Sequence, residues 1–219
     1  MKTPRPEGLR TLRPRRALLA LGALAAGLAL GALAPAAHAA VPPLDELMAQ
    51  LAQVRGGQAS FSEKRSVKGM DAPLLASGTL SFQAPDRFVR STTAPKAETI
   101  AVEGNIVTLT RNGRSRTMVL DASPELEAIV ESVRGTLTGN AAALKQHFMP
   151  IGTGSLAQWT LELQPLTPRR QVMLASIRLS GQRSELRAVE MRMADGDTSL
   201  MAIEPTALVG AGVASAPRP

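Results

Sequence analysis

The sequence predicts an α+β fold that is mainly β, built on a strongly curved antiparallel sheet with about three short helices across its mouth. Two observations predict this class. Most of residues 58–203 alternate apolar and polar side chains in short runs separated by turns, as half-buried strands do, whereas only three segments have helical spacing. Since three short helices cannot cover the apolar face of eight to ten strands, the sheet must curve nearly onto itself.

Residues 1–39 are predicted to be a cleaved secretory signal peptide. Residues 1–16 are basic, residues 17–34 contain only Ala, Leu and Gly, and small residues follow up to Ala39. An uncleaved membrane anchor is the alternative, because 18 apolar residues in a helix would span about 27 Å. Seven leucines among Ala and Gly favour insertion only marginally, so cleavage is preferred. Such a signal fits export to the periplasm of a Gram-negative bacterium, by the general secretion route rather than the twin-arginine route.

Most of the excess positive charge lies in this N-terminal segment. The chain has 25 basic and 18 acidic residues and a net charge of +7, whereas residues 40–219 have 19 basic and 17 acidic residues and a net charge of +2. A nucleic-acid partner is excluded because the remainder offers no basic face with stacking aromatic side chains. The absence of cysteine excludes disulfides, Cys-ligated metals, thiol catalysis and a lipid attached through a cysteine of the chain itself.

Residues 40–205 are predicted to form a single domain that opens with an amphipathic helix over residues 44–54. Gly56-Gly57 ends this helix, and the apolar period then changes from that of a helix to two. Asn112-Gly113 is a strong hairpin signal between two such strands. The strands expected in this half cover residues 58–67, 74–82, 87–92, 99–103 and 106–110, and a further one contains Met118 and Leu120.

Two more helices are expected to interrupt the strands. Ser123 is the expected N-cap of a helix that runs to Gly135, and Asn140 is that of a second helix, which ends before Pro150. Pro205 ends the strand pattern, and residues 206–219, which are rich in Ala, Gly and Pro, are predicted to form a disordered tail. The strands expected in this half cover residues 158–164, 172–180, 186–193 and 198–203.

Three short motifs follow one another in the first half of this domain. They are Phe61 in a helix–glycine–strand opening, the run Ser-Gly-Thr-Leu-Ser-Phe-Gln-Ala-Pro-Asp-Arg-Phe at residues 77–88, and Pro95 before Ile-Ala-Val-Glu-Gly-Asn at residues 100–105. In this order they resemble the start of the periplasmic outer-membrane lipoprotein carrier proteins, the LolA-like family, and the similarity covers most of residues 41–204. The resemblance implies a half-open barrel whose helices form a lid over an apolar cavity.

One position departs from the family pattern. Carriers of this family usually have an arginine directly before the proline, where it holds the lid closed by hydrogen bonds, and this chain has Ala84 there. Arg87 or Arg90 could take over that role. The chain therefore resembles a divergent branch, whose cargo is either a lipoprotein or another lipid such as a glycolipid.

The resemblance implies a periplasmic carrier that shelters acyl chains of a lipoprotein or lipid and transfers them from the inner to the outer membrane. Its implied partners are this cargo, an inner-membrane donor complex and an outer-membrane acceptor, and the carrier is expected to be a monomer without cofactor or metal. The implied lipid-binding residues are Phe61, Leu80, Phe82, Phe88, Ile100, Val102, Val107 and Leu109 in the concave wall, and Leu126, Ile129, Val130, Val133, Leu144 and Phe148 on the lid.

Two other functions remain as alternatives. A sensor or assembly factor of the same fold would recognise lipid or lipoprotein and form a stable complex with one membrane partner. Catalysis has little basis, because His147 is the only histidine after residue 39 and no Gly-x-Ser-x-Gly motif is present, so the chain is not expected to be an enzyme. Arg111, Arg114 and Arg116 flank a hairpin turn. They form either a solvated edge or a site for anionic head groups or a partner's acidic patch.

Overall fold

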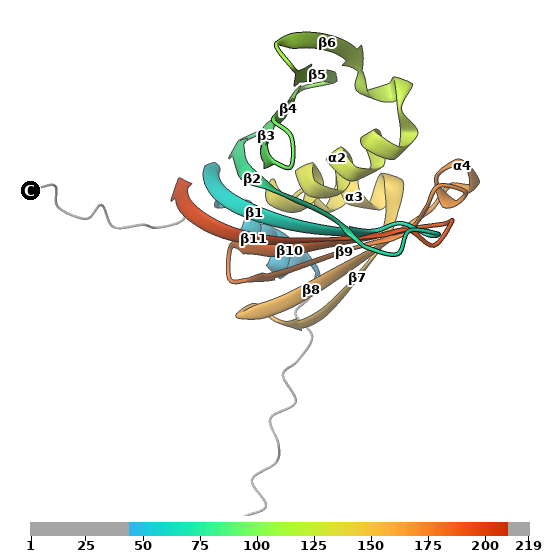
Figure 1. Ribbon diagram of the computed structural model, residues 1–219. Coiled ribbons are helices and arrows are strands. Elements are labelled where there is room, and N and C mark those ends of the chain that lie inside the picture. Colours follow the sequence, from blue (N-terminus) through green and yellow to red (C-terminus); the bar gives the residue numbers. More distant parts are fainter. Residues whose placement is uncertain (1–43, 210–219) are drawn as a thin grey trace, which may run out of the picture. The chain divides into compact units, whose positions relative to one another are not determined.

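One antiparallel sheet of eleven strands dominates the protein, in a computed structural model that describes residues 44–209 (Figure 1). The sheet is strongly curved and does not close, and the mainly β fold class predicted from the sequence is confirmed. The strands are β1 (Gly56–Ser66), β2 (Leu74–Gln83), β3 (Arg87–Ala94), β4 (Glu98–Glu103), β5 (Ile106–Arg111), β6 (Arg114–Val119), β7 (Phe148–Ser155), β8 (Gln158–Pro165), β9 (Leu174–Gln182), β10 (Glu185–Met193) and β11 (Thr198–Val209).

The chain enters this sheet in its middle. The spatial order is β6-β5-β4-β3-β2-β1-β11-β10-β9-β8-β7, so the first half builds outward from β1 to the edge strand β6. The second half starts at the opposite edge, β7, and returns inward until β11 pairs with β1. The connection between the two edges carries the helices α2 and α3, which lie on the concave side of the sheet (Figure 1).

The helices begin at the residues that the sequence indicates. The Ser123 hydroxyl accepts a hydrogen bond from the Leu126 amide at 3.4 Å, and the Asn140 side-chain oxygen accepts one from the Ala143 amide at 2.9 Å, so both predicted N-caps are confirmed. Among residues 44–209 the helices are α1 (Leu44–Leu51), the short 3₁₀ helix η1 (Leu120–Ala122), α2 (Pro124–Leu137), α3 (Ala141–His147) and the single turn α4 (Pro168–Gln171).

The packed core lies on the half of the sheet that contains β7 to β11. Leu161, Leu163, Ile177 and Leu179 of β8 and β9 are completely buried there, and Trp159 donates its indole N–H to the Arg183 carbonyl at 2.9 Å. Helices α1 and α3 fill the space above these strands. The core residues that they contribute are Leu47, Met48, Leu51 and Leu144.

Several boundaries differ from the sequence prediction, among them the end of α1 at Leu51 instead of residue 54, and proline is involved in two of the others. The second helix was expected to include Phe148, but Phe148 begins the unpredicted strand β7, which tolerates Pro150 because β7 is an edge strand. Strand β11 continues past Pro205 to Val209, because from Ile203 onward it pairs with β1 alone, around a β-bulge opposite Ala59. Residues 206–209 of the predicted tail are therefore strand, whereas residues 1–43 and 210–219 lie outside the described part.

Replacing Leu144 by alanine should test whether α3 is part of the packed core. Leu144 is 1 % exposed, so we expect Leu144→Ala to lower the free energy of unfolding by about 2–5 kcal/mol, measured by urea denaturation. Leu200→Ala removes the same atoms from a residue that is 50 % exposed, and it should change the free energy by less than about 0.5 kcal/mol. Equal losses in the two variants would contradict this placement of α3.

Candidate functional site

A half-enclosed apolar cavity of about 290 Å³ lies between α2 and the concave face of the sheet. Its wall comes from both halves of the sheet, with β1 to β4 on one side and β10 and β11 on the other. Only three of its 23 lining residues have polar side chains, namely Gln58, Ser81 and Arg90. The cavity therefore suits an apolar ligand.

Strand register explains how residues distant in sequence form one wall. Residues directly opposite each other on paired strands share a face, so Phe82, Phe88 and Val102 form one row across β2, β3 and β4. The Phe82 and Phe88 rings stack with their centroids 5.0 Å apart. The next row contains Leu80, Arg90 and Ile100. Both rows line the cavity.

Helix α2 covers the cavity with one face and contacts the packed core with another. Leu126, Ile129, Val130, Val133 and Leu137 recur at helical spacing and line the cavity. The other face carries small residues. They are Ala128, Ser132 and Thr136, which are at most 1 % exposed, and Gly135, where an added Cβ would lie 2.7 Å from two carbon atoms of Leu144. The absence of a side chain at Gly135 thus lets α3 approach α2 closely.

Nine of the fourteen residues that the family resemblance implied line this cavity. These nine are Leu80, Phe82, Phe88, Ile100, Val102, Leu126, Ile129, Val130 and Val133. The other five are not part of its lining. Leu144 and Phe148 belong to the packed core beside α1, so the expectation that they lie on the lid was wrong. Phe61 packs beneath Arg90, Val107 lies in a small core with Leu120, and Leu109 pairs with Arg116 near the open edge.

Sequence reasoning missed much of the cavity wall contributed by the C-terminal half. The strands of this half were predicted, but the alternation of apolar and polar residues does not indicate which strands face helix α2. The pairing of β11 with β1 brings this half against the first, and no local signal in the sequence indicates that pairing. The missed residues of these strands include Leu186, Val189, Met191, Met201 and Ile203, and Leu137 at the end of α2 was missed as well.

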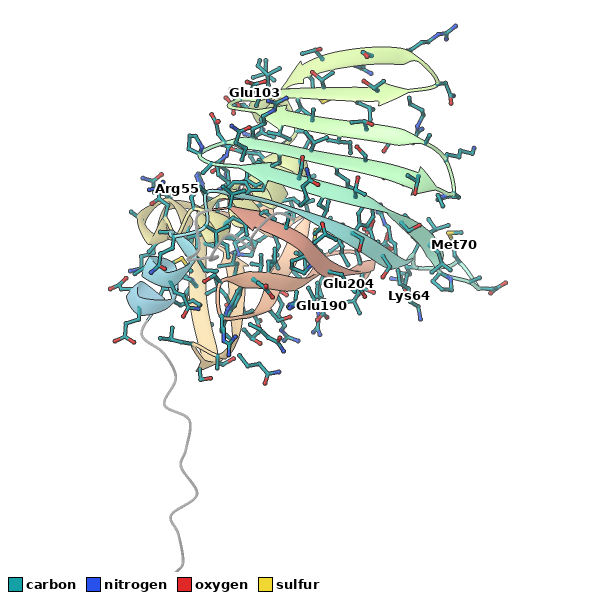
Figure 2. All side chains as sticks on the ribbon, turned by 90° about the vertical axis from the view of Figure 1, so that its left-hand side faces the viewer. Arg55, Lys64, Met70, Glu103, Glu190 and Glu204 are labelled. Carbon is teal, nitrogen blue, oxygen red and sulfur yellow. The ribbon has the colours of Figure 1, made fainter. Side chains whose placement is uncertain are left out.

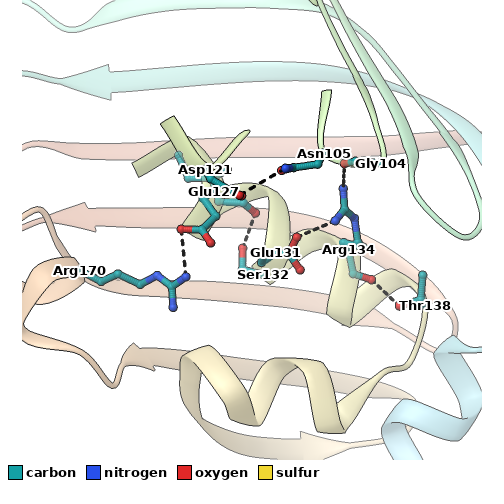
Figure 3. Close-up of polar contacts among 10 residues, drawn as sticks. Gly104, Asn105, Asp121, Glu127, Glu131, Ser132, Arg134, Thr138 and Arg170 are labelled. Carbon is teal, nitrogen blue, oxygen red and sulfur yellow. Dashed lines mark hydrogen bonds and ion pairs between the residues drawn. The ribbon is translucent and has the colours of Figure 1, made fainter. Parts of the chain in front are cut away.

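Polar contacts tie α2 to the sheet at several points (Figure 3). The Arg134 side chain donates to the Gly104 carbonyl in the β4–β5 turn at 2.6 Å, and to Glu131 on its own helix at the same distance. In the same turn the Asn105 side chain donates to Asp121 at 3.3 Å, just before α2 begins. Since Gly104 and Asn105 belong to the first half of the sheet, these contacts hold that half against the helix.

A second group of contacts ties α2 to the other half of the sheet. The guanidinium of Arg170 in α4 is buried and lies 3.1 Å from the Glu127 carboxylate of α2. It also donates to Nδ1 of His147 at 2.7 Å, because arginine has only donors. His147, the one histidine available for catalysis in the sequence analysis, therefore accepts a hydrogen bond from Arg170 and joins α3 to α4.

An arginine does link the helical cover to the wall, but it is not one that the sequence analysis considered. Ala84 precedes the proline in the β2–β3 turn, and Arg90 bonds to Glu63 within the sheet. Arg134 makes the contact from the helix to a backbone carbonyl of the wall. No local signal indicates this contact, because Arg134 has the pattern of an ordinary basic residue in the last turn of a helix.

A charged pair marks the boundary of the cavity on β1 and β3. An Nη atom of Arg90 donates to Glu63 at 2.5 Å, and the other carboxylate oxygen of Glu63 accepts from the Ser199 hydroxyl at 2.6 Å. The guanidinium carbon of Arg90 lies 4.8 Å from the centre of the Phe61 ring, which is a cation–π distance. Charged and hydrogen-bonding side chains therefore lie directly beside the apolar wall of the cavity.

The described residues offer little support for a metal site or for a membrane-spanning helix. Among the described side chains of residues 44–209, no group of three or more His, Asp or Glu is placed to hold a metal ion. No helix in that range has both the length and the apolar composition needed to cross a membrane. The apolar cavity is thus the feature on which a functional assignment has to rest.

The fold and the cavity together define a class of proteins in which a half-open antiparallel barrel holds an apolar cavity under a helical cover. A family model described as outer membrane lipoprotein carrier protein LolA-like matches residues 35–218. The chain belongs to this LolA-like family, as the sequence motifs indicated. A search of curated proteins found no match.

Several solved structures are similar to the chain at low identity. A LolA superfamily protein from Nitrosomonas europaea is 11% identical over 74% of this chain and 92% of that one, with a TM-score of 0.41. A DUF1329 family protein from Desulfovibrio piger is 9% identical over 78% of this chain and 92% of that one, with a TM-score of 0.41. The MucA/MucB complex of Pseudomonas aeruginosa matches at 10% identity over 75% of this chain and 57% of that chain, with a TM-score of 0.39.

Replacing Arg134 by alanine should loosen α2 from the first half of the sheet. Because the Gly104 carbonyl loses its partner, we expect Arg134→Ala to lower the free energy of unfolding by about 1–3 kcal/mol. Amide hydrogen exchange, followed by mass spectrometry, should accelerate in α2 and in the β4–β5 turn. Arg192→Ala removes a 53 % exposed guanidinium paired with Glu190 and should cost less than about 1 kcal/mol. Unchanged exchange in α2 would show that Arg134 does not hold the helix.

Proposed function

We propose that this chain is a periplasmic carrier that shelters the acyl chains of a lipoprotein or lipid and transfers them from the inner to the outer membrane. The observation that carries the proposal is the apolar cavity under α2, whose wall contains almost no polar side chains. Membership of the LolA-like family supports the same function. The proposal includes cleavage of residues 1–39 as a signal peptide and a single domain over residues 40–205.

The energetics of an acyl chain in water explain why a carrier needs such a cavity. Burial of one methylene group contributes about 0.8 kcal/mol, so a 16-carbon chain exposed to water costs roughly 12 kcal/mol. Contacts with Leu, Ile and Val are not directional, which means that they weaken gradually as a chain leaves. Met191 and Met201 on the cavity wall add flexible side chains that adapt to a chain without fixed shape.

The size of the cavity indicates that binding requires movement. Ligand pockets commonly measure about 300–1,000 Å³, and this cavity of about 290 Å³ lies at the lower limit. It accommodates part of one acyl chain, so a larger cargo requires the first half of the sheet to move away from α2. The hydrogen bonds from Arg134 of α2 to Gly104, and from Asn105 in the β4–β5 turn to Asp121, are few enough to break and re-form during each transfer.

Directionality then comes from partners. We infer an inner-membrane donor complex and an outer-membrane acceptor, between which cargo passes in the order of increasing affinity. The carrier itself contributes a reversible binding site, and it acts as a monomer without a cofactor. No hydrolysis of the cargo is part of this function.

Filling the cavity with a larger side chain should abolish lipid uptake. Val133 faces the cavity from α2, so Val133→Trp should weaken the binding of a fluorescent palmitate analogue at least tenfold, measured by fluorescence titration. Leu200→Trp adds the same ring to a 50 % exposed position and should bind the probe like the unmodified protein. Circular dichroism should be the same for both variants.

Two outcomes would contradict the proposal. Equal binding by Val133→Trp and the unmodified protein would show that the probe does not enter the cavity. Native mass spectrometry that detects no lipid on protein isolated gently from the periplasm, and no uptake from membranes, would show that the cavity carries no acyl cargo. A stable complex with one membrane protein, without transfer of lipid, would instead support the sensor alternative.

A further inference from the structure

The concave face becomes rich in arginine from the edge of the cavity outward. Residues two apart on a strand lie on the same face of the sheet, and so do residues directly opposite each other on paired strands. By these two rules the face that forms the cavity wall also carries Arg90, Arg111, Arg114 and Arg116. We call these four residues the concave arginines. On this face of β3 to β6 the only acidic residue is Glu98.

The concave arginines are arranged around apolar residues. Arg90, Ile100, Leu109 and Arg116 form one row across β3, β4, β5 and β6, in which each residue is directly opposite the next. Three strand spacings separate the two arginines, about 14 Å along the sheet. The row thus places positive charge on both sides of an apolar strip that is continuous with the cavity wall at Ile100.

This part of the face lies away from the helices. Figure 2 shows the helices toward the end of the sheet where Arg55 and Glu103 lie, while the strands run on to the hairpin at Met70 at the opposite end. Arg134 fixes α2 to Gly104, at the same end as Glu103. Arg114 and Arg116 are exposed, and Arg116 lies two strands from the cavity residue Ile100, about 10 Å away along the sheet.

Arg90 has an unused hydrogen-bond donor at the edge of the cavity. One of its Nη atoms donates to Glu63, but its buried Nε has no hydrogen-bond partner among the described residues. Nearly all buried polar groups in proteins are paired, and leaving a donor unpaired costs about 1–3 kcal/mol. An acceptor oxygen on the ligand, placed where the acyl chain leaves the cavity, would satisfy this donor.

Positive charge on this face exceeds what its acidic neighbours neutralise. Arg90 pairs with Glu63 and Arg111 pairs with Glu98, whereas Arg114 and Arg116 form no ion pair with the side chains that the structure describes. A planar guanidinium binds phosphate through parallel hydrogen bonds, which favours arginine over lysine for this task. Charge and geometry therefore fit a ligand with an acyl chain and a phosphate group.

We propose that the concave arginines bind the phosphate head group of a lipid whose acyl chain occupies the cavity, with Arg90 contacting the region where chain and head group join. This inference rests on the proposed lipid-binding function and adds the chemical class of the cargo. Continuity of the arginines with the apolar wall favours a phospholipid over an acidic protein, which would have no group to place in the cavity.

A pair of ligands that differ only in the phosphate tests the proposal. Monopalmitoyl lysophosphatidate should bind at least tenfold more tightly than monopalmitoylglycerol, measured by isothermal titration below the micelle-forming concentration. The double variant Arg114→Gln/Arg116→Gln should lose most of this preference and keep its affinity for monopalmitoylglycerol. Arg178→Gln is the matched control, because Arg178 pairs with Glu162 and Glu190 away from the cavity and should leave both affinities unchanged.

The possible outcomes separate this inference from the proposed function. If neither lipid binds, the lipid-binding function fails and the inference fails with it. Equal binding of the two lipids, or a preference that persists in the double variant, leaves acyl binding intact and overturns the head-group site. Binding of glycerol 3-phosphate as tightly as lysophosphatidate would identify a free-phosphate site and also overturn it. If the double variant keeps its lipid preference but loses an acidic protein partner, the arginines bind protein instead.

Discussion

The pairing of the first strand with the last one determines how the rest of the molecule is arranged. Strand β1 lies in the middle of the sheet and pairs with both β2 and β11. The first half of the chain therefore extends from β1 outward to the edge strand β6, and the second half runs from the opposite edge strand β7 inward to β11. The two edges do not pair, and the chain between them carries α2 and α3 across the concave side (Figure 1). The connection between the two halves therefore also supplies the helical cover of the cavity.

Helix α2 meets two different requirements on its two faces. Its small residues, such as Ala128 and Ser132, allow close approach to the packed core, so the helix is firmly attached to the half that contains β7 to β11. Its branched residues, such as Ile129 and Val133, lie above the cavity. The attachment to the other half is mainly a small apolar cluster around Val102 and a few hydrogen bonds. Opening is thus easier on the side of β2 to β6 than on the side of α3.

The sequence was sufficient for the fold class and for much of the site, and the exceptions have physical causes. Alternation and capping residues such as Ser123 are local signals, and local signals predict elements well. Phe148 was wrongly assigned to a helix, and Pro205 was wrongly taken as the end of the last strand. A proline is tolerated wherever a strand lacks a neighbour on one side, and the strand order of the whole sheet determines where that is. The wall residues of β10 and β11 were missed for the same reason, since only strand order brings them to the cavity. Arg134 was missed because its contact with Gly104 depends on how α2 packs against the sheet.

Every second residue of a strand lies on the same face of the sheet. One continuous face can therefore change from apolar to charged side chains along a strand while the backbone stays the same. Along β5 the concave positions are Val107, Leu109 and Arg111, so the face passes from buried and apolar to exposed and charged within five residues, about 14 Å. On β3 the same face changes from the apolar Phe88 to the charged Arg90 within two residues, both of them half-buried. A helix-covered apolar region and an open charged region are therefore parts of one surface, and an amphipathic molecule can contact both at once.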